Sequence, residues 1–192
     1  MWFKQEGAVR FVFDDRKAAQ AAAFLLSKTN GSMNYIKLLN LMYLADRRAF
    51  VESGYPITGA RMVSMDRGPM LSEVYAQITW GDEAETSWSQ AITSPANFSV
   101  SVREEGGRFQ YLSDYDEEVL SQVFDEYGDW DERTLVRFTH TLPEWKDPDG
   151  SSLPIDMRII LEEAGKSSEE IQDVAALVES IRVMKQTSVI AG

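Results

Sequence analysis

Residues 33–75, MNYIKLLNLMYLADRRAFVESGYPITGARMVSMDRGPMLSEVY, decide the fold of this chain. The first half of the stretch is rich in long aliphatic side chains. On a helix with about 100° per residue, its polar residues gather within an arc of roughly 140°. The remaining apolar arc is wider than a surface helix needs. The pattern predicts a central helix that is capped by Ser32 or Asn34, ends at a left-handed Gly54, and is packed on by several other helices.

Asp46 interrupts the apolar arc of this helix. An unpaired carboxylate in a protein core is costly, so Asp46 must be hydrogen-bonded or ion-paired. Its candidate partners are Arg67 and His140. One interpretation is a structural anchor that holds a loop or a second helix. The other is a site residue, because a desolvated carboxylate near a cleft often marks function.

The second half of the stretch is punctuated by proline and glycine. It predicts an ordered connection over residues 55–68 with a short extended run at 61–65. Pro69 suits the first position of a new helix, which would continue through Tyr75 and Ile78.

The stretch also resembles the signature of the Panacea domain, also called SocA-like, which occurs in bacterial and prophage antitoxins. The resemblance rests on the helix motif at 37–46, a Gly-x-Pro at 54–56, RGP at 67–69 with EVY at 73–75, and TH at 139–140 with PEW at 143–145. It covers about residues 18–161 and implies an antitoxin that neutralises a toxin directly or, in some members, delivers it to a protease. Many relatives carry glutamine where Asp46 stands, which implies a position that needs polarity rather than a fixed charge.

The composition is that of a folded protein without covalent cross-links. The chain has 192 residues, 44% hydrophobic and 11% aromatic, and no cysteine, which excludes disulfides, thiol nucleophiles and thiolate metal sites. The opening MWFKQEGAVRFVFDD lacks the pattern of a signal peptide, and no apolar run is long enough to span a membrane. We expect a single cytoplasmic domain over residues 1–192. Its expected class is α+β, mainly α, with about five helices around the central one and a small antiparallel β-hairpin or three-stranded sheet.

The net charge of −12 limits the classes of molecule that the chain is expected to bind. Residues 114–132 carry nine acidic residues and no lysine or arginine. Such a surface repels a phosphate backbone, so we expect no nucleic-acid binding. A basic protein would be steered towards it. The alternative interpretation is that the charge serves solubility.

Hydrophobic periodicity and turn residues predict the other elements. A strand is expected at residues 9–13, and a β-hairpin from residues 98–103 and 108–112. Helices are expected near 15–30, 113–128, 131–142 and 154–165, and over about 168–186 with a capping box of Ser167 and Glu170. The last helix has an apolar stripe from Ile171 to Ile181, which is typical of a docked helix and alternatively suits contact with another protein.

The motifs of common catalytic sites are missing. The chain has no GxxxxGK[ST], GxSxG or HExxH sequence and a single histidine. We therefore expect no cofactor, no metal and no enzymatic activity. The alternative is a small enzyme in which Asp46, Arg67 and His140 converge in a cleft. Against it, a histidine at the edge of a helix face is expected to bond a backbone carbonyl or stack on an aromatic such as Trp145.

Together these features favour a binding protein, namely an antitoxin that neutralises a co-encoded, basic toxin by direct contact. A protease and a second copy of the chain are the alternative partners, and the charge disfavours a DNA-binding regulator. Recognition is expected on the connection after the central helix, because ordered loops on a rigid core often carry function. The candidate partner-binding or motif residues are Tyr43, at the edge of the apolar arc and expected to be partly exposed, with Asp46, Tyr55, Arg61, Arg67, Glu73 and His140.

Overall fold

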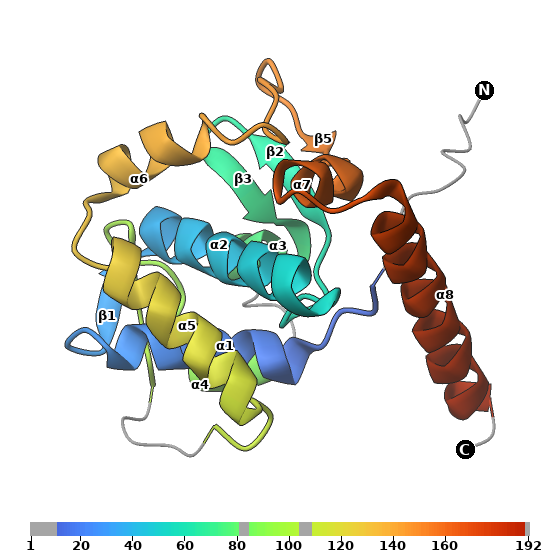
Figure 1. Cartoon of the computed structure of the whole chain (residues 1–192). Coiled ribbons are helices and arrows are strands. Elements are labelled where there is room, and N and C mark those ends of the chain that lie inside the picture. Colours follow the sequence, from blue (N-terminus) through green and yellow to red (C-terminus); the bar gives the residue numbers. More distant parts are fainter. Residues whose placement is uncertain (1–10, 81–84, 104–108, 191–192) are drawn as a thin grey trace.

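The computed structural model describes residues 11–80, 85–103 and 109–190 (Figure 1). The helices are α1 (Asp15–Ser27), α2 (Tyr35–Ser53), α3 (Ser72–Trp80), α4 (Ser87–Ala91), α5 (Asp114–Tyr127), α6 (Glu132–Thr139), α7 (Met157–Glu163) and α8 (Ser168–Ile190). The strands are β1 (Ser32–Asn34), β2 (Met62–Met65), β3 (Gly68–Leu71), β4 (Ser99–Ser101) and β5 (Leu153–Pro154). The α+β, mainly α class predicted from the sequence is confirmed.

Helix α2 is the central element, as predicted. It contacts α1, α3, α5, α6, α7 and β3, and it lies in the middle of the molecule in Figure 1. The Asn34 side chain caps its start by accepting hydrogen bonds from the N–H groups of Ile36 and Lys37. Gly54 ends it in the left-handed region, with φ of 77°. Most of the side chains between these caps are buried, so the helix is held by packing on nearly all sides.

Two small antiparallel sheets flank this core. Strand β2 lies between β3 and β5 in the larger sheet, and β1 pairs with β4 in the smaller one. The predicted extended run at 61–65 is therefore confirmed as β2. The β2–β3 pair runs from Met62 opposite Leu71 to Met65 opposite Gly68. The larger sheet packs on α2 through β3, whose four residues are all buried.

The prediction that Pro69 begins a helix is wrong. Pro69 lies in β3, opposite Ser64 of β2, and α3 begins at Ser72. Strand β3 is an edge strand of its sheet, and a proline is tolerated there because its missing N–H costs no ladder hydrogen bond. The chain therefore completes a hairpin before it turns into the helix.

The predicted hairpin of residues 98–103 and 108–112 is also wrong. Its first half forms β4, but β4 pairs with β1, and buried Val100 lies opposite buried Met33. Residues 109–112 form a turn, and residues 104–108 lie outside the described part of the chain. Burying Val100 against Met33 stabilises the pairing of β4 with β1 more than the turn-forming sequence stabilises a local hairpin. Of the strand predicted at 9–13, residues 9 and 10 are outside the described residues, and residues 11–13 belong to no sheet described.

Helix boundaries late in the chain also differ from the predictions. Helix α6 ends at Thr139 rather than near Leu142, and a turn follows. Pro154 does not begin α7 but lies in β5, and Asp156 caps α7 by accepting from the Arg158 N–H. The helix at 113–128 is confirmed as α5, with a capping box at Ser113.

Helix α8 is docked along its first half. Val178 is buried, and Ile171 and Val174 pack against the core, as the apolar stripe predicted. Further along, the helix extends away from the body (Figure 1), and Val183 and Met184 are exposed. The predicted capping box is present, since Ser167 and Glu170 exchange side-chain to N–H hydrogen bonds.

Candidate functional site

Asp46 is buried, as predicted, but its partner is neither Arg67 nor His140. Its carboxylate accepts from the Thr58 N–H at 3.0 Å and from the Thr58 hydroxyl at 2.5 Å. The Thr58 hydroxyl in turn accepts from the Ala60 N–H. Asp46 is thus the anchor for the connection after α2, because Thr58 lies in the loop that returns over the helix. Burial raises the pKa of Asp46 to about 7, and the two bonds from Thr58 oppose that shift.

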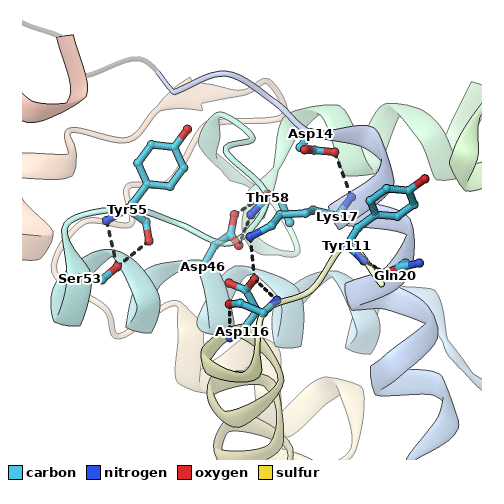
Figure 2. A network of polar contacts seen from close by, with 10 residues as sticks. Asp14, Lys17, Gln20, Asp46, Ser53, Tyr55, Thr58, Tyr111 and Asp116 are labelled. Carbon is cyan, nitrogen blue, oxygen red and sulfur yellow. Dashed lines mark hydrogen bonds and ion pairs between the residues drawn. The ribbon is translucent and has the colours of Figure 1, made fainter. Parts of the chain in front are cut away.

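A second carboxylate lies close to this anchor. Figure 2 shows Lys17 of α1 and Asp116 of α5 beside Asp46 and Thr58. Lys17 donates to Asp116 at 2.6 Å, and Asp116 also accepts from the Ser113 N–H. The negative charge of Asp116 adds to the rise in the Asp46 pKa. One of the nine acidic residues of the 114–132 run is therefore buried and joins α1 to α5 rather than facing a partner.

Tyr43 is fully buried, which corrects the prediction of partial exposure. Its hydroxyl donates to Glu144 at 2.7 Å, and Arg47 donates to the same carboxylate at 2.6 and 3.3 Å. The Glu144 side chain has no exposed surface. Burial and the neighbouring Glu144 raise the pKa of Tyr43 well above its usual value, so the phenol stays protonated. The sequence marked Glu144 only through the PEW block; no periodicity identified it as the partner of α2.

Asn40 ties α2 to the RGP and TH motifs. Its amide donates to the Ile36 and Arg67 carbonyl oxygens, and its own carbonyl oxygen accepts from the Thr139 hydroxyl at 2.9 Å. Gly68 follows with φ of 104°, a conformation that a side chain rarely adopts. A Cβ there would lie 2.6 Å from the Thr139 hydroxyl oxygen and 2.7 Å from the Asn40 carbonyl oxygen. The glycine is needed both for its dihedral angle and for the close approach.

His140 stacks on Trp145, one of the two environments expected for it. The ring centroids are 4.0 Å apart and the planes differ by 14°. Trp145 is itself fixed, because its indole N–H donates to the Met65 carbonyl. Burial lowers the pKa of His140, which favours the neutral imidazole. The pair packs the segment after α6 against the larger sheet.

The remaining candidate residues have separate roles. Arg61 donates to Glu73 at 2.6 Å through its side chain and at 2.8 Å through its N–H, which joins the start of β2 to the start of α3. The Tyr55 ring packs edge-on against Phe11 at 4.9 Å. Arg67 is exposed and lines a cleft beside α6.

The structure does not bring Asp46, Arg67 and His140 together. Asp46 is sealed in the core against Thr58, Arg67 faces solvent, and His140 stacks on Trp145. Among the described residues, no group of three or more histidine, aspartate or glutamate side chains is placed to hold a metal ion. Within the same ranges, no helix is long and apolar enough to cross a membrane.

The buried polar contacts that join α2 to Thr58, Glu144 and Thr139 lie within one family match. The model of the family described as "Antitoxin SocA-like, Panacea domain" matches residues 38–146, more than half of the chain. The matched segment begins within α2 and ends just past the PEW block. No curated protein and no solved structure matches the chain.

Proposed function

The chain belongs to the SocA-like antitoxin family with a Panacea domain, and on that premise we propose that it is an antitoxin that neutralises a co-encoded toxin by direct protein–protein contact. Family membership is the observation that carries this proposal. The chemistry of the described residues supports binding rather than catalysis. The inward polar residues of α2 form hydrogen bonds within the fold itself. Their partners are Thr58, Glu144 and Thr139.

The outer face of α5 supports a basic partner. Asp114, Glu118 and Asp125 are exposed, and at about 100° per residue they fall within roughly 40° of one another on the helix. We call these three residues the acidic stripe. Long-range attraction between such a stripe and a basic toxin speeds association and fixes the orientation of the complex.

Co-expression tests the proposal. The gene beside the one for this chain is induced alone and together with it, and growth is followed. An antitoxin restores growth; arrest that persists despite a soluble antitoxin contradicts the proposal. Measuring the toxin level separates the two modes of action. Direct neutralisation leaves the toxin intact and bound, whereas an adaptor for a protease would lower its amount.

Charge variants test the contact surface. Neutralising the stripe as Asp114→Asn, Glu118→Gln and Asp125→Asn should weaken toxin binding at least about tenfold and reduce its salt dependence. The matched control removes three exposed carboxylates elsewhere, as the triple variant E162Q/E169Q/D173N. Equal affinity of the two triple variants would assign the contact to another face.

A further inference from the structure

A cleft of about 690 Å³ lies between the start of α6, the turn before β4 and the β2–β3 turn. Its lining includes three basic residues, Arg67, Arg133 and Arg137, and two acidic ones, Asp131 and Glu132. Positive groups therefore outnumber negative ones here, although the whole chain has a net charge of −12. The residues that line the cleft thus have a net positive charge, opposite in sign to that of the whole chain.

The three guanidinium groups are only partly neutralised by the protein itself. After the hydrogen bonds from Thr134, the charges of Arg137 and Arg133 contribute to the lowering of the pKa of Asp131. Arg67 takes part in no ion pair among the described residues, and Arg137 donates to the Thr134 hydroxyl at 3.2 Å. Arg133 is 4.0 Å from Glu132, and its side chain is 88% exposed. Arg133 and Arg137 are four residues apart on α6, so both project from the same side of the helix.

An exposed aromatic side chain borders the same cleft. Asn97 and Phe98 form a two-residue turn closed by paired hydrogen bonds between Ala96 and Ser99. Both turn residues have positive φ, 51° and 61°, and a bulky residue such as phenylalanine is a genuine outlier there. Glycine would relieve the strain. The Phe98 ring stacks on Tyr35, with ring centroids 6.3 Å apart, but it is 69% exposed, so burial does not explain the choice.

Ile36 and Val136 add apolar lining to the cleft beside Phe98. A ligand that fits must therefore combine carboxylates for the arginines with an apolar or aromatic group for Phe98 and this apolar lining. Arginine and aromatic side chains are also the residue types that dominate binding energy at protein interfaces. Recognition of acidic segments by arginine clusters is an established mode of peptide binding.

We propose that this cleft, with Arg67, Arg133, Arg137 and Phe98, is a docking site for an acidic, aromatic-containing segment of a partner polypeptide. Stacking on Tyr35 positions the strained Phe98 so that its exposed ring is available for that contact. The inference goes beyond the antitoxin proposal, since the ligand has the opposite charge to the basic toxin expected at the acidic stripe.

The test is an NMR titration of the full-length, ¹⁵N-labelled protein with a synthetic peptide of about a dozen glutamate, serine and phenylalanine residues. A peptide with glutamine in place of glutamate is the matched probe, and inorganic pyrophosphate is the small-anion probe. We expect saturable shifts at Phe98, Arg133 and Arg137 with a Kd below about 1 mM, at least tenfold tighter than for the glutamine peptide.

Three variants separate binding from folding. The double variant R133E/R137E should lose the binding, whereas Lys146→Glu, an exposed lysine away from the cleft lining, should retain it. Phe98→Gly should bind about tenfold more weakly while its Tm stays close to that of the wild type, because the relief of positive φ offsets the lost stacking on Tyr35.

Three results would overturn the inference: no saturable shift with the glutamate peptide, unchanged binding in R133E/R137E, or tighter binding of pyrophosphate than of the peptide. Wild-type affinity in Phe98→Gly would likewise refute the role of the ring. Because no arm of the test uses the toxin, its outcome is independent of whether the antitoxin proposal holds.

Discussion

Substitution of Asp46 by asparagine should change how stability depends on pH. The pKa of the Asp46 carboxyl rises from 3.8 in the unfolded chain to about 7 in the folded protein. Between these values the folded state holds a proton that the unfolded state has lost, so raising the pH favours unfolding. The stabilisation is fully present below the unfolded pKa and is lost as the pH rises through the folded pKa.

The magnitude follows from the shift. A difference of about three pKa units corresponds to about 4 kcal/mol at 1.36 kcal/mol per unit. In measurements from about pH 5.5 to about pH 8.5, the stabilisation by Asp46 falls only up to about pH 7, the folded pKa. The expected loss of unfolding free energy over this window is therefore roughly 2 kcal/mol. An asparagine cannot ionise. The unfolding free energy of the wild type minus that of Asp46→Asn should therefore fall by roughly this amount across the window.

Urea denaturation followed by tryptophan fluorescence at a series of pH values measures this difference. The control is Asp125→Asn, an exposed carboxylate on α5, for which the same difference should stay flat. A flat difference for Asp46→Asn as well would refute the reasoning. It would mean that the two Thr58 donors and the nearby Lys17 keep the buried carboxylate ionised at all these pH values.

Three further substitutions, at Glu144, Gly68 and Thr139, test the surroundings of α2 through the unfolding free energy in urea, and two others, at Glu73 and Gly150, serve as comparisons. Glu144→Ala should cost about 3–5 kcal/mol, because it leaves a buried phenol and a partly buried guanidinium without their shared acceptor. Glu73→Ala removes a more exposed ion pair and should cost about 1 kcal/mol or less. Gly68→Ala should cost more than Gly150→Ala, since both glycines have positive φ but only Gly68 has atoms within 3 Å of the new Cβ. Thr139→Val should cost about 1–3 kcal/mol, because buried Asn40 loses a donor.

Each of these predictions has a distinct contradicting result. Equal losses in Glu144→Ala and Glu73→Ala would show that the buried carboxylate contributes no more than a surface one. Equal losses in the two glycine variants would show that the dihedral angle alone matters. A neutral Thr139→Val would mean that water replaces the lost donor at Asn40.

Features that depend on neighbouring residues were predicted well from the sequence. The cap of α2, predicted at Ser32 or Asn34 and found at Asn34, its end at Gly54 and its apolar arc depend on local capping chemistry and helical periodicity, which any stretch of chain carries with it. The same holds for α5, the capping box of α8 and the stacking environment expected for His140.

Partner choice could not be predicted in this way. The sequence required that buried Asp46 be satisfied, but it did not favour Thr58 over Arg67 or His140, because the answer depends on how the loop folds back over α2. Strand pairing failed for the same reason. Strand β4 pairs with β1 rather than with the next segment of the chain. Burying Val100 against Met33 stabilises this pairing more than the local turn sequence would stabilise a hairpin.

The sequence by itself thus determined a cysteine-free, strongly acidic, mainly helical chain with one central helix and a polar residue that had to be paired inside it. Only the tertiary structure decided that Glu144 joins Tyr43 to Arg47, that Asp116 is buried while the acidic stripe faces solvent, and that three arginines meet beside Phe98. The physical reason is the sequence separation over which each kind of interaction acts. Capping and amphipathicity act over a few residues, whereas these contacts join segments that are distant in the chain and become neighbours only when the core closes.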